Sequence, residues 1–302
     1  FRNRDAALDF DMGREVPVDL KQTVDKVKEA DVIIFAGGIS PAVEGEEMHV
    51  NIPGFKGGDR ETIELPSIQS RLLAELKKAG KKIVFVNFSG SAIALTPESK
   101  TCDAILQAWY PGQAGGTAIA NVLFGDYNPA GRLPVTFYKS TKQLPDFEDY
   151  SMKGRTYRYM ENKAQFPFGY GLTYGKVVVT DAVVSENSAA DTNGTSVSGK
   201  AGFESGTNTT AAPVTIQATV TNQGAIDTRD VVQVYIKNAD SSLAVPNPEL
   251  AAFTPVFLKA GETKTITLSI APKAFTVVDE TGARTEDGSH FHIYVGCTQP
   301  DK

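Results

Sequence analysis

Two hydrophobic patterns alternate along the first 125 residues. The segments DLKQTVDKVKEA, SIQSRLLAELKKAG and GQAGGTAIANVLFG space their apolar residues as one face of a helix does. The segments DVIIFAGG, KKIVFVNFSG and CDAILQAWYPG instead hold continuous apolar runs of strand length, typical of strands that are covered on both faces. Strands that alternate with helices indicate a parallel sheet with crossover helices. We therefore predict an α/β sandwich with a mainly parallel sheet over residues 1–174.

The pattern changes after Gly175. Segments such as VTIQATVTNQG, DVVQVYIKNAD, TKTITLSIAP and HFHIYVG alternate apolar and polar residues and are separated by turn residues. This alternation predicts an all-β, immunoglobulin-like sandwich over residues 175–302. Residues 186–212 are rich in Ser, Thr, Asn and Gly and carry no periodicity, so we expect a long loop or insert there. Two short glycosylation acceptor patterns begin in it, at Asn193 and Asn208, and carry little weight.

Composition narrows the functional classes. The net charge of −6 excludes a basic surface that would hold nucleic acid. The apolar runs are too short to span a membrane, and the first residues show no leader pattern. Cys102 and Cys297 stand far apart in the sequence, which argues against a disulfide framework or a zinc site. His290 and His292 fit one face of a strand better than a metal pair, so no metal and no cofactor is expected.

Candidate chemistry lies in two loops that follow predicted strands. In open parallel sheets ligands bind beyond the carboxyl ends of the strands, and both GGISPAVEGEE and WYPGQAGG fall there. The first loop crowds Glu44, Glu46 and Glu47 together, and the second holds Trp109 and Tyr110. Carboxylates beside aromatic rings suit a sugar, whose hydroxyls form hydrogen bonds and whose apolar face stacks on a ring. On the residues alone, a solvated acidic loop is the favoured interpretation, and the tryptophan could belong to the core.

Longer motifs resemble a known family. WYPGQAGGTAIANVLFGDYNPAGRLPVTFY, GRTYRYM and FPFGYGLTYG are similar to the C-terminal half of glycoside hydrolase family 3, which includes β-glucosidases and β-xylosidases. The segments VTNQGAIDTRDVVQVYIKN and PVFLKAGETKTITLSI resemble the fibronectin type III-like domain that closes many members of that family. The resemblance implies that the catalytic nucleophile belongs to an N-terminal β/α barrel absent from these residues. It also implies that the α/β sandwich is truncated at its N-terminus.

The resemblance assigns a role to the acidic loop. Retaining glycosidases need one carboxylate as nucleophile and one carboxylic acid as proton donor. The family motif falls best on Glu44 as the general acid/base, with Glu46 as the alternative or as a neighbour whose charge raises the pKa of the donor. Glu47 would point away from both if the segment were extended.

Other residues receive weaker assignments. Asp59 and Arg60, in KGGDRETIEL, resemble a family Asp-Arg pair and are expected to anchor the loop; the alternative is a helix N-cap with Arg60 in the first turn. Trp109 and Tyr110 are expected to wall the substrate pocket. Arg132, Arg155 and Arg158 are expected to pack domains together rather than to touch substrate.

The resemblance favours part of a retaining, exo-acting β-glycosidase for plant-type oligosaccharides, inactive without the barrel. Its partners would be the oligosaccharide substrate and that barrel, and the whole enzyme would be periplasmic or secreted. The alternative is a non-catalytic carbohydrate-binding or scaffold module. A flavodoxin-like nucleotide-binding protein is disfavoured because the GxGxxG spacing is missing around GQAGG.

Overall fold

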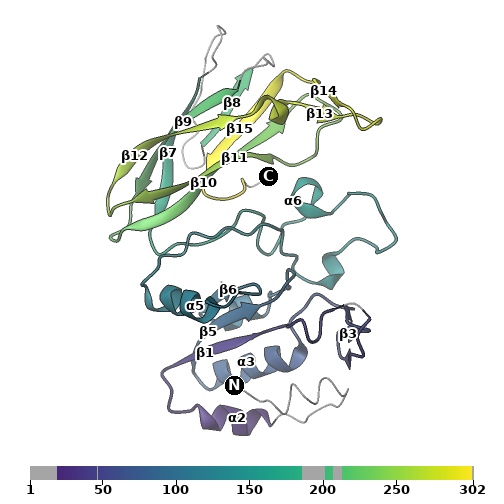
Figure 1. Cartoon of the computed structure of the whole chain (residues 1–302), viewed down its shortest axis with the longest axis vertical. Coiled ribbons are helices and arrows are strands. Elements are labelled where there is room, and N and C mark those ends of the chain that lie inside the picture. The colour runs from purple at the N-terminus through teal and green to yellow at the C-terminus, as the bar shows by residue number, and fades with distance from the viewer. Residues whose placement is uncertain (1–18, 46, 186–200, 207–212, 301–302) are drawn as a thin grey trace. The chain divides into compact units, whose positions relative to one another are not determined.

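The computed structural model describes residues 19–45, 47–185, 201–206 and 213–300 (Figure 1). These residues form two compact units. The N-terminal unit comprises the residues up to 120 together with residues 137–146, and the C-terminal unit comprises residues 121–136 and those from 147 onward. The boundary that we expect after residue 174, where the strand pattern changes, stays a prediction.

A three-stranded parallel sheet forms the centre of the N-terminal unit, as the sequence predicted. Its order is β1–β5–β6, with β1 at Val32–Gly38, β5 at Lys82–Phe88 and β6 at Ala104–Gln107. The central strand β5 pairs with β1 from Val32↔Lys82 onward and with β6 from Val84↔Ala104 onward. The carboxyl ends of the three strands therefore lie at one edge of the sheet.

Three described helices of this part occur where the apolar spacing predicted them, and one short helix, at Glu98–Thr101, was not predicted. Those of the N-terminal part are α2 (Leu20–Lys26), α3 (Ser67–Lys78), the short α4 (Glu98–Thr101) and α5 (Gly115–Phe124). Asp19 caps α2, because its side chain accepts a hydrogen bond from the Gln22 amide at 2.9 Å. Leu73 and Leu76 are the fully buried members of the α3 stripe.

Strand β1 differs from the prediction in one respect. Ile33 and Phe35 are buried, but Val32 and Ile34 on the opposite face are 48% and 51% exposed. The prediction that this apolar run is covered on both faces is therefore wrong for the described residues. The physical reason is that the described residues cover only the side on which Ile33 and Phe35 lie.

A small antiparallel sheet shapes the loop between β1 and α3. It consists of β2 (Asn51–Ile52), β3 (Phe55–Lys56) and β4 (Asp59–Arg60). Asp59 and Arg60 thus form a strand, and α3 begins only at Ser67 after Pro66. The alternative that they start a helix is wrong, since the close return of the chain pairs them with β3 instead.

The C-terminal unit contains the predicted β-sandwich. One antiparallel sheet has the order β11–β10–β15–β8 and the other β12–β9–β7. The strands are β7 (Val177–Ser185), β8 (Ala201–Gly206), β9 (Val214–Asn222), β10 (Thr228–Asn238), β11 (Glu249–Leu258), β12 (Thr263–Ile270) and β15 (His290–Gly296). Shorter elements are α6 (Thr156–Tyr159), the 3₁₀ turns η1 (Thr141–Gln143, in the N-terminal unit) and η2 (Pro272–Phe275), and the hairpin of β13 (Val277–Val278) and β14 (Arg284–Thr285).

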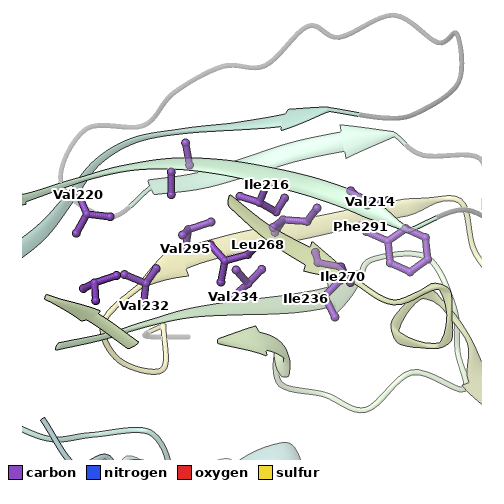
Figure 2. Close-up of a cluster of buried hydrophobic side chains, with 14 of the residues drawn as sticks. Val214, Ile216, Val220, Val232, Val234, Ile236, Leu268, Ile270, Phe291 and Val295 are labelled. Carbon is purple, nitrogen blue, oxygen red and sulfur yellow. The ribbon is translucent and has the colours of Figure 1, made fainter. Parts of the chain in front are cut away.

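The inward faces of the two sheets build the core of this unit (Figure 2). Ile216 and Ile270 from one sheet and Val234 and Ile293 from the other are fully or almost fully buried. The alternation in the sequence selects these positions, because side chains on a strand point to opposite faces in turn.

Part of the predicted insert is a strand. Residues 201–206 pair with β15 as β8, so the prediction of a loop over 186–212 is wrong there. The backbone pairing offered by the β15 edge overrides a sequence that lacks β-branched residues. The remainder of the insert, including both glycosylation patterns, lies outside the described residues.

The three arginines have different settings within the C-terminal unit. Arg132 pairs with Asp230 on β10, and its Nε donates to the Cys297 carbonyl at 3.1 Å. Arg158 lies 3.1 Å from the Glu249 carboxylate. Arg155 donates locally, to the carbonyls of Asp149 and Ser151. Arg132 and Arg158 thus tie the irregular segments before residue 174 to sandwich strands.

Candidate active site

Three loops converge beside the Glu44 carboxylate. Glu44 follows β1, Ser91 follows β5 and Tyr110 follows β6, so each side chain comes from the carboxyl end of a different parallel strand. Ser91 Oγ donates to Glu44 Oε1 at 2.7 Å, and the Tyr110 hydroxyl makes a longer bond to Oε2 at 3.3 Å. The sheet order places these loops at one rim, as expected for an open parallel sheet.

The strand ends below the rim are fixed by amide side chains. Gln69 on α3 makes two bonds to Gly38, accepting from its amide at 2.8 Å and donating to its carbonyl at 2.7 Å. Asn87 donates to Gln107 at 2.6 Å, and Gln107 donates to Ser89 at 3.0 Å. These bonds join β1 to α3, β5 to β6, and β6 to the loop that follows β5.

Arg60 closes the site from the small sheet. Its Nη1 lies 3.9 Å from Glu44 Oε1 and donates to Ser91 Oγ at 3.0 Å and to the Ala92 carbonyl at 3.2 Å. Its Nε donates to the Thr62 carbonyl at 3.2 Å. The buried Nη2 has no hydrogen-bond partner among the described residues. An unmatched buried donor is costly, which marks this arginine as more than packing material.

Electrostatics differ among the groups around Glu44. Burial lowers the pKa of the Arg60 guanidinium from its usual value, while the negative charges of Glu44 and Glu64 oppose that shift. Burial, followed by the charge of Glu44, raises the pKa of the Tyr110 hydroxyl. Tyr110 therefore stays neutral at ordinary pH and can donate to the carboxylate.

Two close approaches of the backbone depend on glycine. A Cβ on Gly58 would lie 1.7 Å from the Gly45 carbonyl oxygen, and Gly58 has a φ of +89°. A Cβ on Gly90 would lie 2.7 Å from the ring of Tyr110. Only glycine lets the acidic loop close on the small sheet and lets the tyrosine ring reach its place.

Strained backbone also occurs in these loops. Glu47 has a φ of 49° and Trp109 a φ of 56°, which bulky residues rarely adopt. Residues 41–45 form turns, so the extended segment on which the prediction for Glu47 depends does not form there. Glu47 is exposed, and Glu46 lies outside the described residues, so its suggested influence on Glu44 stays a prediction.

The other predicted site residues have distinct settings. Trp109 is half-buried and meets Phe137 edge to face, with ring centroids 6.1 Å apart, whereas Tyr110 is 40% exposed. Asp59 is exposed on β4, so Arg60 makes the anchoring contacts of the pair. Sequence reasoning missed Ser91; its place just after a buried strand, in NFSGSA, is the signal that could have found it.

Metal and membrane sites are not found in the part of the chain that the structure describes. Those residues contain no group of three or more His, Cys, Asp or Glu side chains placed to hold a metal ion. None of the helices that the structure describes is long and apolar enough to cross a membrane.

Comparison with known proteins identifies the family. Residues 9–174 match the model of the glycosyl hydrolase family 3 C-terminal domain. The chain belongs to glycosyl hydrolase family 3. Residues 230–299 match a fibronectin type III-like domain, so both parts of the predicted resemblance are confirmed.

Individual relatives agree with this membership. The family 3 chain is 46% identical over 298 residues to a xylan 1,4-beta-xylosidase of Xylanibacter ruminicola, an alignment that covers 98% of this chain and 32% of that protein. It is 32% identical to a periplasmic beta-glucosidase of Salmonella typhimurium, covering 92% of this chain and 34% of that protein. The chain thus spans about a third of the length of these curated relatives.

A solved family 3 structure has the same fold. The beta-glucosidase of Bifidobacterium adolescentis superposes with a TM-score of 0.76 at 28% identity, over 95% of this chain and 40% of that one. The predicted fold class, a parallel α/β domain followed by a fibronectin type III-like sandwich, is confirmed.

Proposed function

We propose that this chain supplies the general acid/base of a retaining, exo-acting β-glycosidase, and that Glu44 is that residue. The observation that carries the proposal is the convergence of Glu44, Ser91, Arg60 and Tyr110 at the carboxyl rim of the parallel sheet. The Glu44 side chain is 23% exposed, so it is held by neighbours and yet reachable.

The chemistry needs two steps from this carboxyl group. In the first, protonated Glu44 gives its proton to the glycosidic oxygen while a nucleophile from another part of the enzyme attacks the sugar carbon. In the second, the Glu44 carboxylate takes a proton from water, which then displaces the nucleophile. The nucleophile would stand about 5–5.5 Å from Glu44, as in retaining enzymes generally.

The substrate class follows from the relatives and the rim. The names of the matched relatives include a xylan 1,4-beta-xylosidase and beta-glucosidases, which supports plant-type β-linked oligosaccharides. Trp109 and Tyr110 would stack on the sugar, since aromatic faces pair with its apolar face. The name of the Salmonella relative supports a periplasmic or secreted whole enzyme, which cell fractionation would test.

The first experiment uses the 302-residue chain alone. Without a nucleophile it should not turn over nitrophenyl β-xyloside or β-glucoside, because acid–base help alone contributes only about 10²–10⁴-fold. Joining it to the barrel-bearing part of the same enzyme should restore activity. Clear turnover by the isolated chain would contradict the proposal. If Glu44→Gln did not change the activity of the joined enzyme, the chain would instead be a non-catalytic carbohydrate-binding or scaffold module.

A further inference from the structure

A cavity of about 370 Å³ lies within the C-terminal unit. It is lined by the end of β10, residues 243–251, η2 and the β13–β14 hairpin. Its size is at the lower end of the range for small-molecule sites, with room for one sugar ring. Buried Ile236 and Phe291 contribute to its lining, and so does Tyr159.

The charge around this cavity is opposite to that of the chain. Four cationic side chains line it, Arg158, Lys237, Lys273 and Arg284, against the single carboxylate of Glu249. The whole chain carries a net charge of −6. A positive recess on an acidic protein attracts anions selectively, because the local field and not the net charge acts on a bound ligand.

Among the described residues, only one of the four cations, Arg158, forms an ion pair. Arg158 Nε lies 3.1 Å from Glu249 Oε1. Lys237 Nζ donates to the Val245 carbonyl at 2.5 Å, and Arg284 Nη1 donates to Thr276 Oγ1 at 3.0 Å, so both heads are positioned by neutral groups. Among the described residues no carboxylate lies within ion-pair distance of Lys237, Lys273 or Arg284.

The burial of Lys237 adds to this imbalance. Burial lowers the pKa of the Lys237 ammonium from its usual value, and the more distant Glu249 only partly opposes the shift. A partly desolvated cation without a counter-charge, such as Lys237, gains most from an anionic ligand, since a charge-assisted hydrogen bond is stronger than a neutral one.

We propose that this cavity binds a carboxylated sugar of the uronic acid class. The carboxylate would meet the ammonium and guanidinium groups, and the ring would lie along the apolar lining. Asn238 and Thr276, which also line the cavity, can meet sugar hydroxyls. The choice of a sugar among small carboxylates rests on the proposed glycosidase function. An enzyme with this site would retain substrates that carry acidic side groups.

The test measures binding to the 302-residue chain by calorimetry, with methyl NMR on residues such as Val277 to locate the site. The probes are D-glucuronate, neutral D-glucose, acetate and inorganic phosphate. Glucuronate should bind at least about tenfold more tightly than glucose or acetate, because bonds to charged groups and contacts to the ring both contribute. Its affinity should fall as ionic strength rises.

Charge-reversal variants supply the control. Lys273→Glu and Arg284→Glu, both at exposed lining positions, should each weaken glucuronate binding about tenfold or more. Lys259→Glu makes the same charge change at an exposed position outside the cavity and should leave binding unchanged. Thermal unfolding of each variant identifies a folding defect. The salt dependence of glucuronate affinity is measured on the unmodified chain, so it tests the inference even if a variant fails to fold.

Several results would overturn the inference. These are equal affinity for glucose, equal or tighter binding of phosphate or acetate, or an equal loss in Lys259→Glu. Because no turnover is measured, failure of Glu44 as acid/base would not affect this result. Loss of glucuronate binding would likewise leave the role of Glu44 standing.

Discussion

Two arginine–carboxylate pairs in this chain contain the same chemical groups but differ in separation and in solvent exposure. Arg60 and Glu44 stand 3.9 Å apart at the rim of the parallel sheet, with side chains 10% and 23% exposed. Arg132 and Asp230 are in direct contact inside the C-terminal unit, with side chains 9% and 5% exposed. The first carboxylate is held mainly by the neutral donors Ser91 and Tyr110, whereas the second is held by its arginine.

The difference separates a group that can react from one that only ties segments together. Asp230 is closed off, since it also accepts a bond from the Val231 amide at 2.6 Å. Burial raises the pKa of Asp230 even though Arg132 acts in the opposite direction. Glu44 keeps part of its surface accessible, as the proposed role of proton donor requires.

The largest effect should come from breaking the buried pair. Asp230→Ala leaves the Arg132 charge buried without a partner, and we expect a loss of about 3–5 kcal/mol in the free energy of unfolding. Urea unfolding of the chain measures this. The double variant Arg132→Met/Asp230→Leu should recover most of the loss, because it removes both desolvated charges. If the free energy of unfolding of Asp230→Ala lay within about 1 kcal/mol of that of the parent chain, this pair would contribute no more than a weak surface ion pair.

The second effect concerns Glu44 in the enzyme joined to its barrel. Glu44→Gln should slow substrates with poor leaving groups by about 10²-fold or more, and activated aryl glycosides much less, because a proton donor matters most for a basic leaving oxygen. Azide should rescue the second step, since it needs no general base. Steady-state kinetics across a series of aryl leaving groups measures both.

Glu47→Gln is the matched control for Glu44, because Glu47 is an exposed glutamate on the same loop. It should leave the leaving-group dependence unchanged. If Glu46→Gln rather than Glu44→Gln showed that dependence and the azide rescue, the acid/base assignment would move to Glu46.

A smaller effect should distinguish the two neutral donors. Ser91→Ala removes the 2.7 Å bond to Glu44 and should lower kcat/KM for poor leaving groups about tenfold, while Tyr110→Phe removes the 3.3 Å bond and should lower it only a few-fold. Both losses should shrink with activated aryl leaving groups, which a general folding defect would not produce. Equal losses on every leaving group would mean that the donors only support the loop.

The smallest effect should come from an exposed pair. Hydrogen bonds from Ser289, followed by the contact with His290, lower the pKa of Asp240 from 3.8 to about 2. A lowered folded-state pKa stabilises the fold above the unfolded-state value and loses that contribution as pH falls from 3.8 toward 2. Asp240→Asn should flatten this part of the curve of unfolding free energy against pH, and it should lower the free energy of unfolding slightly at neutral pH, where the ionised Asp240 makes its full contribution. An unchanged slope in the variant would mean that other carboxyl groups set it.

Much of the fold could be predicted because the spacing of apolar residues reveals helices and strands, and turn-forming residues mark where these end. The stripe of α3, the runs of β5 and the alternation of β9 and β12 each repeat with the spacing that their structure requires. The strands β2, β3 and β4 are only two residues long each, too short to show an alternating pattern. The strand β8 could not be predicted, since it depends on pairing with the distant β15. Propensity gives no information about such a partner.

The sequence by itself determined the order of the main helices and strands, the family and the three carboxylates at the end of a parallel strand. Tertiary structure alone decided that Ser91, Arg60 and Tyr110 meet Glu44, because β5 lies between β1 and β6 and brings three distant loops to one rim. It also decided that Asp230 is closed off while Glu44 is reachable. The physical reason is that a side chain's chemistry is local, whereas its solvent exposure and its partners depend on which strands pair.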